Sequence, residues 1–389
     1  MLGENRGIDW IDACVEEGRM KKVHTFFQGA KDHESRIAQF EVTPQSPPYH
    51  AEGPFLQAHI ERMVAALYTI QEGGSLLEIE ELAARKDLKD HIEGLEHTMR
   101  EHAGTLLAYC VLHDLAKPVT STLVAPNASA GAHIGFQTQK KMPTDKARSQ
   151  DHQLYAKYVQ HLSIEQGLNT PKELTAAFYD RYEVRVHYPK HGKIGGAAEY
   201  RDAHLAIGQW LRLREQDIDL LGWLIRHHID AISGFEKEAS VNQYEILAGR
   251  AQRDGFDVQE ALDLLLAAVF LDACIGSLRY REGVFSTDFK ILFHFLEAEI
   301  HIAPHRRKER ARKAGEKKQK AFKALLERFD LIGSAVFSLF DIPFGPERGA
   351  LMHEIHAFVR GELAELSPQY TSEELAFRLK QARAAFDAE

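Results

Sequence analysis

Hydrophobic residues recur every three or four positions over several stretches of this chain, and this spacing predicts amphipathic helices. The clearest stretch is FLQAHIERMVAALYTI (55–70), which has apolar residues at positions 55, 56, 60, 63, 64 and 67. The same spacing predicts further helices at 102–116, near 151–163, and at 201–213, 217–232 and 258–278. The sequence contains no heptad run and no internal repeat. The pattern therefore indicates a mainly α-helical fold built as a helical bundle.

Segments without helical spacing divide the chain into regions. Residues 1–48 are expected to form a short helix and then an extended piece, and TPQSPPYHAEGP (43–54) is expected to form a turn or linker because prolines interrupt helices. Residues 119–199 break the helical pattern, and FYDRYEVRVHYP within them alternates as a β-strand does. The sequence thus predicts a helical domain at 49–284, with a small extended or β insertion at 119–199, and a helical C-terminal region at 285–389.

Five of the predicted helices carry a metal-type ligand on the face where the apolar stripe calls for a hydrophobic residue. These residues are His59, Asp114 with His113 beside it, His204, His228 with His227 beside it, and Asp272. Spacings of three, four or seven residues place each on the buried face of its helix. Burying carboxylates and imidazoles together costs free energy unless they are paired or bind a cation. The pattern therefore predicts a shared metal site, and this mixture of ligands suits Mn²⁺, Fe, Zn²⁺ or Co²⁺.

The ordered set of histidines and aspartates resembles the HD-domain superfamily of metal-dependent phosphohydrolases. LLAYCVLHDLAKP is similar to the family's apolar run that ends in His-Asp and is followed three residues later by Lys. The stretch EYRDAHLAIGQWLRLREQDIDLLGWLIRHH and the helix LLAAVFLDACIG are similar to the family's later histidine and aspartate helices. TPQSPPYHAEGPFLQAHI is similar to HD modules of RNA-end repair proteins, and HDLAKPVT to that of tRNA nucleotidyltransferases. The resemblance covers roughly residues 49–280.

The resemblance implies a ligand set for one or two divalent ions, drawn from Mn, Fe, Co, Ni, Zn or Mg. One ion would be held by His59, His113, Asp114 and Asp272, and a second ion or the substrate phosphate by His204 and His228, with His227 as a further candidate. About 90 residues separate Asp114 from His204, which is more than a minimal HD domain needs. His152, in QDHQLYAKY, is therefore the alternative to His204.

The same resemblance implies hydrolysis of a phosphomonoester or phosphodiester of a nucleotide or nucleic-acid end by a metal-activated water. Asp114, Lys117, His204 and His228 are the catalytic candidates. Lys117 lies one helical turn after Asp114, where it could neutralise a phosphate oxygen or simply favour the helix dipole. His50 and Glu52 precede the first ligand helix and could support a ligand, act as a general acid or cap a turn.

Two other functions fit the same residues. HD folds also host oxygenases with a di-iron centre, which would use this ligand set for oxidation. A catalytically inactive HD module could instead bind a signalling nucleotide or RNA. The set of candidate ligands shows no gap, and this favours an enzyme.

Composition points to an ordinary globular protein of 389 residues, with 57 acidic and 48 basic residues and a formal net charge of -9. Its three cysteines form no CxxC pair, which disfavours a thiolate zinc site or a disulfide framework. The sequence shows neither a secretory signal nor an apolar run long enough to span a bilayer. We therefore expect a reduced, cytoplasmic protein without membrane contact.

One segment departs from the acidic character of the chain. HRRKERARKAGEKKQKAFK (305–323) contains ten Lys or Arg and two Glu, a net charge of +8. Such a run predicts contact with the RNA or DNA backbone, or else a solvated helix face. The apolar stretch after it, ALLERFDLIGSAVFSLFDIPFG, predicts docking on the catalytic body or a homodimer interface.

Overall fold

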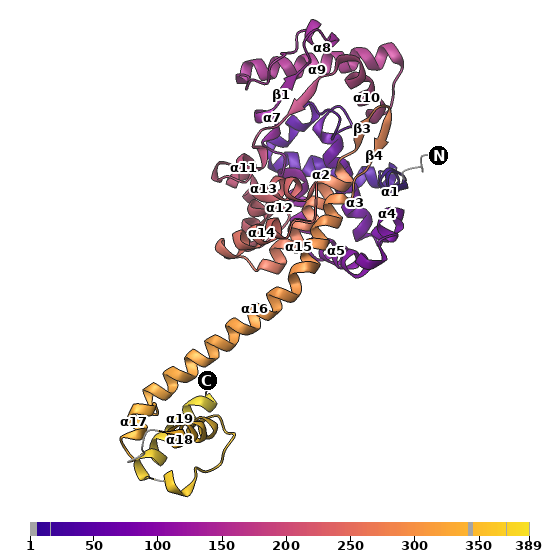
Figure 1. The fold of residues 1–389 in the computed structure, drawn as a ribbon. Helices are drawn as coiled ribbons and strands as arrows, with labels where there is room; N and C mark the ends of the chain where they lie inside the picture. Colours follow the sequence, from indigo (N-terminus) through magenta and orange to yellow (C-terminus); the bar gives the residue numbers. More distant parts are fainter. Residues whose placement is uncertain (1–5, 16, 341–344, 371, 389) are drawn as a thin grey trace. The chain divides into compact units, whose positions relative to one another are not determined.

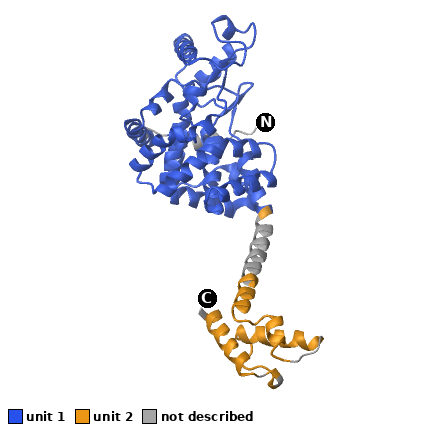
Figure 2. Ribbon diagram, turned by 90° about the vertical axis from the view of Figure 1, so that its left-hand side faces the viewer, with its two compact units in different colours: residues 1–301 blue, residues 302–389 orange. Residues whose placement is uncertain are grey.

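The computed structural model describes the backbone of residues 6–15, 17–340, 345–370 and 372–388, and within these the side chains outside 6–8, 11, 17, 303–318, 369 and 388. The chain forms two compact units, Met1–His301 and Ile302–Glu389 (Figure 2). The boundary falls inside helix α16 (Lys290–Arg328), later than the change near residue 285 that the sequence suggested. The described residues are mainly helical, as predicted, with two two-stranded antiparallel sheets.

The N-terminal region is more helical than the sequence suggested. It contains α1 (Arg6–Cys14), α2 (Glu17–His33) and the 3₁₀ helix η1 (Ser35–Glu41). The prediction of an extended piece before residue 43 is therefore wrong. Val23, Phe26, Phe27 and Ala30 are all buried, and their spacing of three, four and seven residues defines one face of α2, which packs on α3 (Leu56–Gln71).

Long helices and several short helical turns form the centre of unit 1 (Figure 1). After α3 they are η2 (Leu76–Glu78), α4 (Glu80–Ala83), η3 (Lys86–Leu88), α5 (Lys89–Glu101), α6 (Ala103–Leu112), α12 (Arg201–Trp210), α13 (Glu215–Phe235), α14 (Val241–Arg253) and α15 (Val258–Val269). Helix α6 packs against α3, α13 and α15. The helix expected at 258–278 leaves α-helical geometry after Val269 and continues as the π-helix η5 (Phe270–Gly276), which packs on α3.

The insertion builds one end of unit 1, where α8, α9 and α10 lie together in Figure 1. Its elements are α7 (Lys117–Thr120), β1 (Thr122–Val124), α8 (Ala130–His133), α9 (Asp145–Gln166), α10 (Pro171–Tyr182), β2 (Arg185–His187), α11 (His191–Gly195) and η4 (Ala198–Tyr200). Strand β2 pairs with β1, with Thr122 opposite His187. The predicted strand is shorter than expected because Phe178 and Tyr182, four residues apart, bury their rings from the helix α10.

A short hairpin and the second unit complete the described chain. The hairpin joins β3 (Arg279–Arg281) to β4 (Val284–Ser286), and unit 2 contains the end of α16, α17 (Gly333–Phe337), α18 (Pro346–Val359), η6 (Pro368–Tyr370) and α19 (Glu373–Ala388). Leu326 and Val336 are buried in a core with Leu351 and Leu379, so part of the apolar stretch after residue 323 is covered within unit 2. Among the described helices, none is both long and apolar enough to cross a membrane.

The basic segment 305–323 lies within α16, as its helical pattern suggested. The side chains of 303–318 lie outside the described residues. Contact between this segment and nucleic acid therefore stays a prediction.

Candidate metal centre

Buried polar side chains from five parts of unit 1 meet around Asp114. They are His59 on α3, His113 and Asp114 just after α6, His191 at the start of α11, His228 on α13 and Asp272 on η5. The ligand atoms of His59, His113 and Asp114 lie within 4.8 Å of one another, and so do those of Asp114, His191 and His228. Asp114 is thus common to two groups of candidate ligands.

Asp272 also faces both groups. Its Oδ1 lies 3.2 Å from His59 Nε2 and 3.9 Å from His113 Nε2, and its Oδ2 lies 3.9 Å from His228 Nε2. Asp114 Oδ2 lies 3.1 Å from His113 Nε2, and its Oδ1 lies 3.3 Å from Nε2 of the histidine that begins α11. Two carboxylates are therefore surrounded by imidazole nitrogens that converge from separate helices.

Local backbone contacts fix how three of the imidazoles present their nitrogens. In His113, His191 and His228, Nδ1 lies between 2.7 and 3.2 Å from a carbonyl oxygen three or four residues earlier. A carbonyl only accepts hydrogen bonds, so Nδ1 must carry the proton. Nε2 is then left with a lone pair that faces the carboxylates, which is the state a metal ligand needs.

Several buried atoms of this cluster make no hydrogen bond to the described residues. These atoms are both ring nitrogens of His59, Nε2 of His113, Nε2 of His228 and both carboxylate oxygens of Asp114. The short contacts between them lack hydrogen-bond geometry, and a buried polar group without a hydrogen bond costs about 1–3 kcal/mol. A divalent cation would accept lone pairs from imidazoles and carboxylates together, so these residues fit a metal ion.

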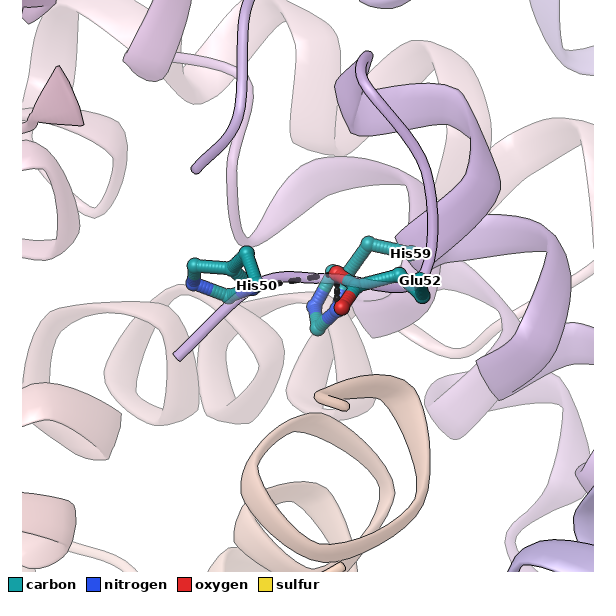
Figure 3. A group of neighbouring side chains, drawn as sticks. All are labelled: His50, Glu52 and His59. Carbon is teal, nitrogen blue, oxygen red and sulfur yellow. Dashed lines mark hydrogen bonds and ion pairs between the residues drawn. The ribbon is translucent and has the colours of Figure 1, made fainter. Parts of the chain in front are cut away.

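Glu52 contacts His59 on the Nδ1 side of its ring (Figure 3). Its Oε1 accepts a hydrogen bond from His50 Nδ1 at 3.1 Å and lies 3.2 Å from His59 Nδ1, while its Oε2 accepts the Leu278 backbone N–H at 3.0 Å. Glu52 is thereby fixed, and it directs the opposite nitrogen of His59 towards Asp272. Among the roles considered for Glu52, this geometry matches support of a ligand.

The neighbours of the two carboxylates keep both of them ionised. Burial alone would raise the pKa of Asp114, but His113 and Lys117 outweigh it and hold that pKa well below its usual value. Burial is likewise outweighed at Asp272, whose pKa is lowered by the nearby histidines. Burial lowers the pKa of His191 to about 3 and that of His228 to about 4, so both imidazoles are neutral near pH 7.

His59 differs from the other histidines because it lies between two carboxylates. Burial lowers its pKa, but Asp272 and Glu52 outweigh burial and raise it to about 9. The His59 imidazole is therefore protonated on both nitrogens near pH 7 in the metal-free protein. It must lose the Nε2 proton before Nε2 can bind a metal. We expect metal binding near pH 7 to release about one proton, and affinity to rise about tenfold per pH unit up to about pH 9. Calorimetric titration with Mn²⁺ in buffers of different ionisation enthalpy measures the release.

The variant Glu52→Gln is the matched control for this proton. It keeps the shape of residue 52 but removes one of the two carboxylates that raise the pKa of His59. Metal binding to this variant near pH 7 should then release fewer protons, and its metal affinity should depend less on pH. Metal binding without any buffer-dependent heat in the native chain would contradict the assignment of His59 as a ligand.

Lys117 lies beside the cluster and lines a cavity. Its Nζ lies 2.6 Å from Asp114 Oδ2 and 4.8 Å from the centre of the Tyr188 ring. The cavity has a volume of about 480 Å³, and its walls include Lys117, His191 and Asp272. A volume of this order holds a small molecule or one end of a larger one, in contact with the candidate ligands.

The structure places three other predicted histidines outside this cluster. His204 is buried, but its Nε2 lies 3.0 Å from the carbonyl oxygen of Gly195. Nδ1 of His227 lies 3.3 Å from Nη1 of Arg250. His227 points in a different direction from His228 because neighbouring residues on a helix point about 100° apart. His152, the alternative to His204, is hydrogen-bonded to Ser121 Oγ at 2.7 Å. His191, and not His204, lies with Asp114 and His228 in this structure.

Little in the sequence could have identified His191. It begins a helix of five residues, so it belongs to no apolar stripe. A weak signal is the glycine after it. A Cβ atom on Gly192 would lie 2.8 Å from His228 Cε1, so glycine is needed for α11 to approach α13 this closely.

Comparison with protein-family models, with curated proteins and with solved structures found no match for this chain. The function is therefore inferred from the atoms of the site. These atoms comprise two ionised carboxylates, four imidazoles and a buried lysine beside a cavity.

Proposed function

We propose that this chain is a metal-dependent phosphohydrolase that cleaves a phosphomonoester or phosphodiester of a nucleotide or nucleic-acid end. The observation that carries the proposal is the convergence of His59, His113, His191 and His228 on Asp114 and Asp272, next to Lys117 and the cavity. Imidazole and carboxylate together suit Mn, Fe, Co, Ni or Zn more than Mg, which prefers oxygen ligands. The resemblance of the sequence motifs to HD-domain phosphohydrolases supports the same reaction.

Asp114 is suited to bridge two metal ions because both groups of candidate ligands include it. One ion would be held by His59, His113, Asp114 and Asp272, and a second by Asp114, His191 and His228. When bound, a divalent ion polarises a phosphoryl oxygen and lowers the pKa of a coordinated water to about 7.

The chain's own groups bind and orient the phosphate. Lys117 is 3% exposed, so its charge acts in a site from which most water is excluded. It faces both Asp114 and the cavity, where it can neutralise a phosphoryl oxygen as negative charge develops. In the reaction, the water loses a proton as its oxygen bonds to phosphorus, the ester P–O bond breaks, and the leaving oxygen takes up a proton.

A screen of metals against substrates tests this proposal. The full chain is stripped with a chelator and reloaded with Mn²⁺, Co²⁺, Ni²⁺, Zn²⁺ or Fe²⁺. Release of phosphate or of a free hydroxyl is then measured on mononucleotides and on RNA ends with 3′- or cyclic phosphates. We expect turnover with at least one metal and none with the stripped protein. Tight binding without turnover would favour an inactive module, and a product that requires O₂ would favour an oxygenase.

The basic segment 305–323 is proposed to contact the backbone of a nucleic-acid substrate. Replacing Arg306, Arg307, Lys308, Arg310 and Arg312 by glutamine should weaken RNA binding and reduce its salt dependence, since each lost phosphate contact lowers the slope against log salt by about 0.7 for a single strand. Binding of a labelled single-stranded RNA at several salt concentrations measures both effects. Unchanged binding would show that this segment is a solvated helix face.

A further inference from the structure

Strand β2 carries two basic residues from the protein surface towards the candidate metal centre. Arg185 and His187 both line the cavity that contains Lys117, His191 and Asp272. Residues two apart on a strand point to the same face and lie about 6.6 Å apart along it. That separation is similar to the distance between neighbouring phosphates of an extended nucleic-acid strand. One short segment, 185–191, thus leads from the cavity rim to a candidate ligand.

Arg185 is exposed, and no described carboxylate forms an ion pair or hydrogen bond with its guanidinium. Burial lowers the pKa of His187, and the charges of Lys140 and Arg185 lower it further. By contrast, Lys117 already has Asp114 as a partner at 2.6 Å. Arg185 therefore offers an unpaired positive charge on a cavity wall that also includes the carboxylates of Glu236 and Asp272.

An exposed aromatic ring lies on the wall of the same cavity. Tyr49 is 46% exposed, and the Arg279 guanidinium lies 5.5 Å from the centre of its ring. Arg279 is itself held by an ion pair with Asp288 at 2.8 Å, which fixes it over the ring. Positive charge along a groove together with an exposed aromatic ring is the combination that binds single-stranded nucleic acid, because every base can stack on a ring.

We propose that Arg185 and His187 bind backbone phosphates next to the phosphoester that is cleaved, and that Tyr49 stacks on a nearby base. The substrate is then the end of a single-stranded nucleic acid, and a free mononucleotide would leave the rim contacts unused. This inference rests on the proposed function for the identity of the reacting group. The rim contacts themselves are made by residues outside the candidate ligand set.

The test compares Arg185→Gln with Arg281→Gln in the full chain. Arg281 is an exposed arginine on β3 that is not among the cavity residues, so its replacement removes the same charge elsewhere. The probe is a fluorescein-labelled single-stranded hexaribonucleotide with a terminal phosphate, in 5′ and 3′ versions, and binding is measured by anisotropy with EDTA present. Arg185→Gln should weaken binding about five- to tenfold and lower the salt slope by about 0.7.

The controls distinguish RNA binding at the cavity rim from non-specific electrostatic attraction of RNA to the protein surface. Arg281→Gln should bind like the native chain, and Arg185→Lys should restore most of the affinity because it keeps the charge. With Mn²⁺ present, adenosine monophosphate should bind Arg185→Gln and the native chain equally. Equal weakening by Arg185→Gln and Arg281→Gln, or no weakening by either, would overturn the inference. The EDTA measurement needs no turnover, so failure of the hydrolase proposal would be seen separately, in the screen of metals and substrates.

Discussion

Replacing Asp114 by asparagine is expected to lower turnover by about a hundred- to a thousandfold and to reduce the metal content of the purified chain. Asparagine keeps the size of the side chain but removes the negative charge shared by both groups of candidate ligands. The change also leaves Lys117 buried without the carboxylate that lies 2.6 Å away. Breaking a buried ion pair in this way costs about 3–5 kcal/mol, so part of the effect could come from lost stability.

The double variant Asp114→Asn/Lys117→Met separates the two effects, because it removes the unpaired charge together with the carboxylate. Its melting temperature should lie closer to that of the native chain than the melting temperature of Asp114→Asn does. It should nevertheless remain inactive and contain little metal. Asp230→Asn is the matched control, since Asp230 bonds Arg250 outside the cluster, and it should change turnover by less than about threefold. Turnover, metal content and circular dichroism are measured on each variant. Full activity and full metal content in Asp114→Asn would remove this residue from the mechanism.

A second large effect should distinguish His191 from His204. His191→Gln is expected to lower kcat/KM by about a hundredfold, because the loss of a ligand misplaces the metal and the phosphate it binds. His204→Gln should stay within about threefold of the native chain, since it can lose only a hydrogen bond to Gly195, worth about 1 kcal/mol of stability. The two histidines are both buried, so burial alone does not predict this difference.

Steady-state kinetics and metal analysis on both variants decide between these positions. The expected loss of metal from His191→Gln is independent of any substrate. If His204→Gln lost metal and activity while His191→Gln kept both, the assignment made from the sequence would be restored. Helix α11 would then have no place in the site.

Long helices with strong apolar periodicity were predictable, and so were the ligand positions that interrupt their stripes. The apolar positions of 55–70 place His59 on the buried face, and those of 217–232 do the same for His228. The structure brings both together with Asp114 and Asp272. Local spacing was enough here because a long helix fixes the direction of each side chain.

His191 and the cavity rim were not predictable, because long-range pairing places them. Strand β2 has three residues and is positioned by its pairing with β1, more than 60 residues away along the chain. His204 shows the limit of such patterns, since an inward-facing histidine can contact a carbonyl oxygen as readily as a metal. The π-helix at Asp272 also has no signature in the apolar spacing of 258–278.

Crystals of the full chain soaked in Mn²⁺ and measured at an energy where manganese scatters anomalously provide the most direct test. We expect one or two anomalous peaks within coordination distance of His59, His113, Asp114 and Asp272, and of Asp114, His191 and His228. Peaks only elsewhere, or imidazoles turned away from Asp114 and bonded to protein atoms, would contradict a metal centre at this position.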